Sequence, residues 1–207
     1  MARLAEAEVG VIVCPRSAIG IASLDRPTHL HNCVAPLRDL LAEGVSSSKI
    51  YLTYDGRLHD AQILSVLESA KESGLLAAFH AENHDIIEFL SKKFRAAKKT
   101  AARYHPLSRP EYCEAEAVYR IISLAEAAGN VPVYIVHLST AAGLAAIETA
   151  QHRGQPVFTE VCPQHLLLDD SCYEEPDNKG LKYIMAPPAR KALDRKALWQ
   201  GLAKGSI

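Results

Sequence analysis

Residues 75–90 have the sequence LLAAFHAENHDIIEFL, in which an apolar run is followed by an amphipathic one. The run LLAAFH has the length of a buried strand and ends on His80, and the helical spacing of Ile87 and Leu90 predicts a helix from about 84 to 97. Residues 132–153 repeat the arrangement, since PVYIVHL precedes a second helix and contains His137. Near-continuous apolar strands that alternate with helices indicate parallel βα units.

The same alternation extends over most of the chain. Further strands are expected at 9–14, 49–54, 156–161 and 183–188, further helices at 33–43, 59–73, 112–128 and 191–203, and a proline-interrupted loop at 105–112. A complete (β/α)8 barrel has eight strands and about 250 residues. The pattern therefore predicts an α/β fold, an incomplete (β/α)8 TIM barrel made of its middle to later βα units. An open doubly wound sheet is the alternative, but no glycine-rich turn follows the first strand.

Composition limits the classes of function. The chain has 207 residues, a net charge of −1, 48% hydrophobic and 23% charged residues, as in ordinary globular proteins. Such a charge gives no electrostatic reason to expect binding to nucleic acid or to an anionic membrane. No apolar run reaches the roughly 18 residues of a membrane span. The five cysteines are odd in number and form no CxxC pair, so we expect reduced thiols in a cytoplasmic protein.

Polar residues at the strands are the candidates for chemistry, because parallel α/β folds gather functional side chains at the carboxyl ends of strands. His80 and His137 end two apolar strands, Lys49 opens a third with Tyr54 at its far end, and Glu160 ends a fourth. A single strand-end histidine is often only structural, but two in neighbouring units favour metal binding. A lysine among apolar residues is usually paired, neutralised or modified.

Three other residues have less weight. Glu82 follows His80 by two residues, a position from which a carboxylate can orient a neighbouring side chain, and Glu160 is expected to be a packing or supporting partner. Cys162 follows a strand, but the sequence offers no base partner for it, so a structural thiol is the better interpretation.

Six ordered motifs carry a resemblance to a known family. They are GVSSSKIYLTYDG (44–56), FHAENHDIIEFL (79–90), YHPLSRPEYCEAEAVYR (104–120), VYIVHLSTAAGLAAI (133–147), FTEVCPQHLLLDDSCY (158–173) and GLKYIMAPPAR (180–190). Together they resemble the central segment of the dihydropyrimidinase/D-hydantoinase family of the amidohydrolase superfamily. The resemblance covers residues 34–207, which are expected to form a partial catalytic barrel, whereas residues 1–33 form a divergent segment without a recognisable match.

The resemblance implies a role for particular residues. Lys49 matches the carbamylated lysine that bridges two metal ions, most often zinc, and His80 with His137 matches the pair that holds the second metal. Tyr54 matches the tyrosine that donates a hydrogen bond to the substrate carbonyl and its developing oxyanion. Ala186 stands where relatives usually carry serine, at a substrate contact made by the backbone. The implied reaction is hydrolysis of the cyclic amide of a dihydropyrimidine or hydantoin to a carbamoyl amino acid, by a homotetramer in pyrimidine catabolism.

Two parts of the family pattern have no match in the chain. The first metal is held in the family by a His-x-His pair at the end of the first barrel strand, but His29 and His31 lie on no apolar strand and are better explained as a solvated helix start. The catalytic aspartate has no counterpart either, so we expect the isolated chain to have little turnover. A non-enzymatic scaffold relative, a decayed gene product, an allantoinase and a dihydroorotase remain alternatives.

Overall fold

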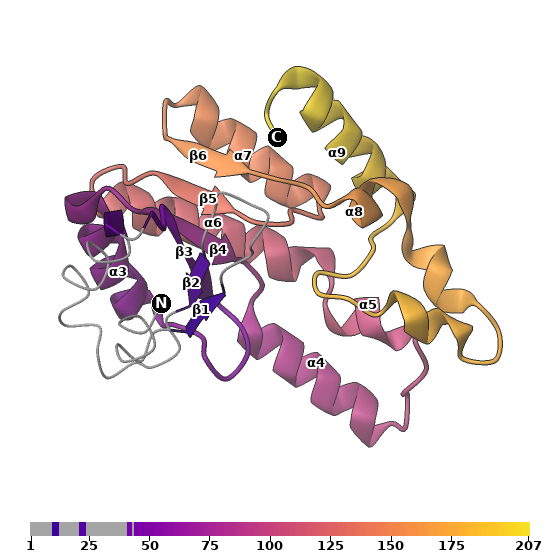
Figure 1. Cartoon of the computed structure of the whole chain (residues 1–207). Helices are drawn as coiled ribbons and strands as arrows, with labels where there is room; N and C mark the ends of the chain where they lie inside the picture. Colours follow the sequence, from indigo (N-terminus) through magenta and orange to yellow (C-terminus); the bar gives the residue numbers. More distant parts are fainter. Residues whose placement is uncertain (1–9, 13–20, 24–40, 43) are drawn as a thin grey trace.

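The computed structural model describes residues 10–12, 21–23, 41–42 and 44–207. Six strands form one sheet in sequence order (Figure 1): β1 (Gly10–Ile12), β2 (Ile21–Ser23), β3 (Ser47–Tyr51), β4 (Leu76–His80), β5 (Val133–Ile135) and β6 (Val157–Thr159). Strands β2 to β6 are parallel, and β1 pairs antiparallel with β2.

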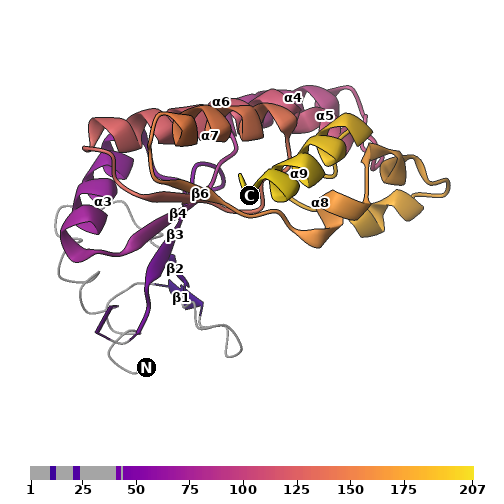
Figure 2. The same cartoon turned by 90° about the horizontal axis from the view of Figure 1, so that it is seen from above.

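Helices lie between the strands or after the last one along the chain, and those that contact the strands do so on one face of the sheet. They are α3 (Asp60–Ser73), α4 (His84–Ala96), α5 (Tyr104–Ser108), α6 (Glu111–Ala127), α7 (Ala141–His152), α8 (Pro163–Leu167) and α9 (Ala192–Lys204), with two 3-10 turns, η2 (Asp170–Glu174) and η3 (Lys179–Tyr183). Figure 2 shows α3, α6 and α7 on the same side of the sheet, and α9 packs on α7. The parallel strands with their outer helices are part of a (β/α)8 barrel, as the sequence predicted.

Local signals explain where the helices begin and end. Gly74 ends α3 in the left-handed conformation with φ of 81°, and its N–H donates to the Ala70 carbonyl at 2.8 Å. Asn83 begins α4, because its side-chain oxygen accepts a hydrogen bond from the Ile86 N–H at 3.1 Å. Thr140 does the same for α7 through the Gly143 N–H. The two N-terminal caps, Asn83 and Thr140, each follow a strand closely, so strand ends and helix starts are held at the same edge of the sheet.

The hydrophobic core lies between the sheet and these helices. Phe79 of β4 is fully buried there, as are Ile63 and Leu67 of α3 and Ile121 of α6. A smaller cluster, centred on Tyr173 and Ala189, packs under η2 and the loop before α9. The main core therefore fixes the strands that carry the candidate residues of the sequence analysis.

Most expected elements are confirmed, and the differences have physical reasons. Strands 49–54, 75–80, 132–138 and 156–161 are present but shorter, and the helices expected from residue 59 onwards end within about two residues of their predicted limits. The strand expected at 183–188 is wrong: η3 ends at Tyr183, and two prolines, 187 and 188, follow without a ladder partner.

Three further differences concern short elements. The loop expected at 105–112 contains helix α5, whose proline at 106 falls in the first turn, where no intrahelical N–H is needed. Strand β2 was not predicted, and β1 is antiparallel rather than parallel to its neighbour. The helix expected at 33–43 and the pair His29 and His31 lie almost wholly outside the described residues. Within the described residues, no helix is long and apolar enough to cross a membrane.

Candidate functional site

Lys49 and His80 lie on neighbouring strands and on the same face of the sheet. Lys49 is the third residue of β3 and is paired with Ala78, while Tyr51 is paired with His80. Because side chains alternate along a strand, Lys49, Tyr51 and His80 share one face. The Lys49 Nζ lies 5.4 Å from the centre of the Tyr51 ring. Burial lowers the pKa of Lys49, although Glu160 and Cys162 act in the opposite direction. The environment therefore favours an uncharged amine at this position more than water does.

His137 meets His80 edge to face at the ends of their strands. It lies two residues beyond β5 with a positive φ of 43°, and the two ring centres are 4.6 Å apart. The His80 Nδ1 and the His137 Nε2 face each other at 2.9 Å. Only one proton fits between two such nitrogens, so at least one of them presents a lone pair to the other. A cation that binds imidazole could take the place of that proton if the two rings moved slightly apart.

The fit to a metal ion is therefore that of a partial site. The His137 Nδ1 is buried without a hydrogen-bond partner. Within the part of the chain that the structure describes, no group of three or more His, Cys, Asp or Glu side chains is placed to hold a metal. The residues present that could contribute to a metal site are two converging imidazoles and one partly buried lysine amine. Lysine becomes an oxygen ligand only after modification, and carbon dioxide reacts with the uncharged amine.

Glu82 contacts the ring nitrogen of His80 that faces away from His137. Its Oε2 lies 2.9 Å from the His80 Nε2 and accepts a hydrogen bond from the Arg109 Nη1 at 2.7 Å. Its Oε1 lies 3.8 Å from the Arg190 Nη2. Burial alone raises the pKa of this carboxyl, but the hydrogen bond to His80 and the charges of Arg109 and Arg190 bring the pKa below its ordinary value. The sequence placed Glu82 near the site, whereas nothing in the sequence indicated its two arginine partners.

Glu114 of α6 holds the loop that carries His137. The carboxylate accepts hydrogen bonds from the Ser139 N–H at 3.0 Å, from the Ser139 hydroxyl at 2.8 Å and from the Thr140 hydroxyl. Burial raises the pKa of Glu114, against the opposite effect of Arg190 and of these donors. Since Thr140 also caps α7, Glu114 joins α6, the His137 loop and α7 at a single point.

Tyr54 lies close to His80 but not on a strand. Strand β3 ends at Tyr51, so the expectation of Tyr54 at a strand end is wrong; it occupies the following turn with φ of 73° and is 40% exposed. Its ring centre is 5.3 Å from that of His80, and the Arg109 guanidinium lies 5.6 Å from the Tyr54 ring. Burial raises the pKa of Tyr54. The phenol therefore stays protonated and can donate a hydrogen bond near the histidine pair.

Ala186 lies in the loop before α9, with a cis peptide bond to Pro187. The neighbouring carbonyls are fixed by histidines: the carbonyl of Met185 lies 2.6 Å from the His105 Nε2, and that of Pro187 lies 3.0 Å from the His165 Nε2. These contacts position the backbone at Ala186, but they do not connect it with Lys49 or the histidine pair.

The remaining candidates are supporting residues. The Glu160 carboxylate accepts a hydrogen bond from the Tyr134 hydroxyl at 3.2 Å. Cys162 is a free, half-buried thiol whose pKa is raised by burial, so the structure gives no sign of an activated nucleophile.

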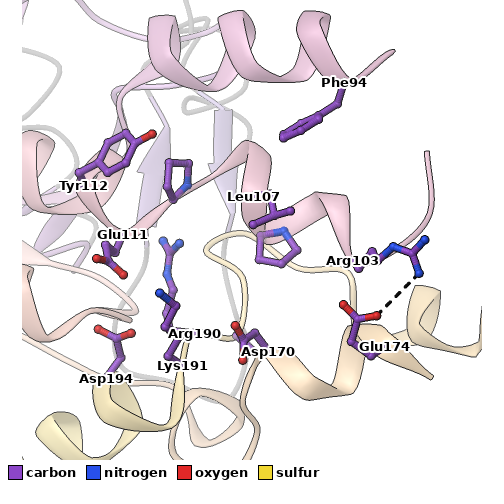
Figure 3. A pocket seen from close by; sticks show the side chains of 13 residues that line it. Phe94, Arg103, Leu107, Glu111, Tyr112, Asp170, Glu174, Arg190, Lys191 and Asp194 are labelled. Atoms are coloured by element: carbon purple, nitrogen blue, oxygen red, sulfur yellow. Dashed lines mark ion pairs between the residues drawn. The ribbon is translucent and has the colours of Figure 1, made fainter. Parts of the chain in front are cut away.

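A separate cavity of about 370 Å³ lies where α5 and the start of α6 face η2 and the start of α9 (Figure 3). Neither Lys49 nor the two histidines line it. Figure 3 shows Arg190 pointing from the loop before α9 toward the start of α6, so this side chain stands between the cavity and Glu82.

The stability of the metal-free protein is expected to fall in mild acid because of His137. Burial, reinforced by His80 and Lys49, lowers the pKa of His137 from 6.5 to about 2. Below about pH 6.5, His137 is protonated in the unfolded chain but not in the folded chain. Its contribution to the free energy of unfolding is therefore fully present above that pH and declines as pH falls toward 2. Between about pH 7.5 and 5.5, this residue should lower the free energy of unfolding by about 1.4 kcal/mol, and partly buried His105 and buried His165 act in the same direction.

Urea unfolding at both pH values measures this effect. The variant His137→Gln should lose about 1.4 kcal/mol of the pH dependence, whereas His152→Gln, on the exposed side of α7, should keep all of it. An unaltered dependence in His137→Gln would show that His137 is not buried in its neutral form.

The chain is similar to proteins that carry hydantoinase and dihydropyrimidinase names. No protein-family model matches the chain. A D-phenylhydantoinase of Escherichia coli O1:K1 / APEC is 47% identical over 168 residues, which are 81% of this chain and 36% of that relative. A D-phenylhydantoinase of Escherichia coli O9:H4 (strain HS) is 45% identical over 180 residues.

Solved structures agree with the sequence relatives. The D-hydantoinase of Bacillus sp. AR9 superposes with a TM-score of 0.86 at 33% identity, over 90% of this chain and 41% of that chain. The dihydropyrimidinase of Brevibacillus agri NCHU1002 gives 0.83 at 34% identity, over 89% and 40%. A dihydroorotase of Campylobacter jejuni, 13% identical with a TM-score of 0.62, shares the fold. The chain thus spans 36% of the length of the D-phenylhydantoinase of Escherichia coli O1:K1 / APEC and 41% of the length of the D-hydantoinase of Bacillus sp. AR9.

Proposed function

Because the chain belongs, over the segment that it matches, to the dihydropyrimidinase/D-hydantoinase family, we propose that it carries part of the metal site of a cyclic-amide hydrolase. The observation that most strongly supports this proposal is the convergence of the His80 Nδ1 and the His137 Nε2 at 2.9 Å. Two converging imidazoles near a partly buried lysine whose pKa is lowered by burial support a ligand set better than a packing motif.

Each residue has a role in this proposal. His80 and His137 would hold one divalent cation, zinc in the first instance, and Lys49 after carbamylation would supply an anionic oxygen ligand. When bound, such a cation would polarise the ring amide and lower the pKa of the attacking water. Tyr54, protonated and beside His80, donates a hydrogen bond to the substrate carbonyl as negative charge develops on it. The backbone at Ala186 contacts the substrate ring.

The substrate class follows from the relatives. We infer a dihydropyrimidine or a hydantoin, opened at the cyclic amide to a carbamoyl amino acid, and a cytoplasmic homotetramer that acts in pyrimidine catabolism. Residues 34–207 are the part assigned to the catalytic barrel. Because the chain offers no match for the first metal pair or for the catalytic aspartate, the isolated chain should turn over little, since acid–base help is typically worth about 10²–10⁴-fold.

Ring opening of hydantoin and dihydrouracil tests the proposal on the purified chain, supplied with zinc and bicarbonate, with the carbamoyl product measured by chromatography. We expect slow product formation that disappears in His137→Ala and after chelation but persists in His152→Ala, on the exposed side of α7. Fast, family-level turnover would contradict the inference that a proton-transfer group is missing. Turnover that survives both chelation and His137→Ala would contradict the metal-site proposal itself.

A further inference from the structure

Glu82 is a fully buried carboxylate that has hydrogen bonds with His80 and Arg109 and an ion pair with Arg190. Its Oε2 accepts from the Arg109 Nη1 at 2.7 Å and lies 2.9 Å from the His80 Nε2, and its Oε1 faces the Arg190 Nη2 at 3.8 Å. An ionised carboxylate is only an acceptor, so the proton of a neutral His80 must lie on Nε2. The other nitrogen, Nδ1, then carries a lone pair, and this is the atom that faces His137.

Arg190 contacts residues that support each of the two histidines. Its Nε donates to the Ser139 hydroxyl at 3.0 Å, its Nη1 to the Arg109 carbonyl, and its Nη2 points toward Glu82. Ser139 follows His137 by two residues, in the loop that Glu114 holds. One buried guanidinium therefore contacts the loop of one histidine and the carboxylate that orients the other.

We propose that Glu82 is a positioning residue that keeps the His80 proton on Nε2 and so presents Nδ1 toward the space shared with His137. A hydrogen bond from Arg109 and an ion pair with Arg190 hold Glu82 in place. Arg190 influences the distance between the two rings, because it donates a hydrogen bond to Ser139 near His137 and forms an ion pair with Glu82 behind His80. This inference deepens the proposed metal site and rests on it for the identity of the ligand. Its physical basis is general, since partners behind a metal-binding imidazole fix the tautomer and orientation of the ring.

Zinc affinity measured by competition with a chromogenic chelator tests the role. Glu82→Met removes the acceptor and should weaken zinc binding about 10–100-fold. Glu82→Gln keeps an acceptor oxygen with the same shape but loses the charge, so its loss should be smaller. Arg190→Met should weaken binding in the same direction as Glu82→Met. Glu88→Met and Arg195→Met, which remove surface ion pairs with Lys92 and Asp169, should bind zinc as the unaltered chain does.

Histidine ¹⁵N NMR on the metal-free protein adds a readout that requires no bound metal. In the unaltered chain, His80 should show a proton on Nε2 alone. In Glu82→Met, the form protonated on Nδ1, which can donate to the His137 Nε2, should become populated. Glu82→Gln serves for both measurements if the methionine variant does not fold, and it should show a smaller change in the same direction.

The outcomes separate the two proposals. Unchanged zinc affinity and an unchanged His80 tautomer in folded variants of Glu82 would overturn the positioning role. If the unaltered chain binds no zinc, the proposed function fails, and the tautomer of the metal-free variants still decides whether Glu82 positions His80.

Discussion

Replacing Phe79 with alanine is expected to lower the free energy of unfolding by about 3–5 kcal/mol. Phe79 lies in the middle of the sheet on β4, and its side chain is fully buried in the main core. Removing most of a buried aromatic ring loses its transfer free energy and leaves a cavity that a close-packed core fills only in part. The change also acts next to His80, so the strand end that carries this histidine loses a buried contact with the core.

Phe89 is a matched control for this substitution. It is also a phenylalanine, on α4, but 67% of it is exposed. Phe89→Ala should therefore change the free energy of unfolding by no more than about 0.5 kcal/mol. Urea unfolding followed by circular dichroism compares the two variants. Equal midpoints for both would mean that the core on this face of the sheet is not packed as described.

The second large effect is expected for Glu114→Leu, which should cost about 3 kcal/mol or more. The substitution leaves the Ser139 N–H and the hydroxyls of Ser139 and Thr140 without their acceptor. All three groups are buried, and an unsatisfied buried donor costs about 1–3 kcal/mol. The loop that follows β5 would then lose the contact that fixes its course between the sheet and α7.

The position of His137 should change together with stability in this variant. Glu126→Leu, on the exposed side of the same helix, controls for the loss of a charge and should have little effect on either property. Thermal unfolding gives the stability, and the NMR signal of His137 reports its environment. A Glu114→Leu protein as stable as Glu126→Leu would contradict the anchoring role of Glu114.

The sequence was sufficient for the elements with strong local signals. The strand of residues 75–80, the helix that follows Asn83 and helix α3 were all predicted, because apolar periodicity acts between near neighbours in the chain. The segment 183–188 was misjudged because a short apolar run has no periodicity that separates a buried strand from a buried loop.

The candidate site was predictable as a set of residues but not as a network. His80 and His137 stood out because each follows an apolar run, and Lys49 because it interrupts one. Arg190 gave no such signal: its importance comes from contacts with Ser139 and Glu82, which tertiary folding alone brings together. Glu114 is similar, since a glutamate on an amphipathic helix is ordinarily exposed.

The content of bound zinc tests the central claim most directly. The purified chain is equilibrated with zinc and bicarbonate, freed of unbound ions, and compared with Lys49→Ala, His137→Ala and the control His152→Ala. We expect bound zinc in the unaltered chain and in the control, and its loss from the other two variants. Equal zinc content in all four proteins would contradict the assignment of Lys49 and His137 to a metal site.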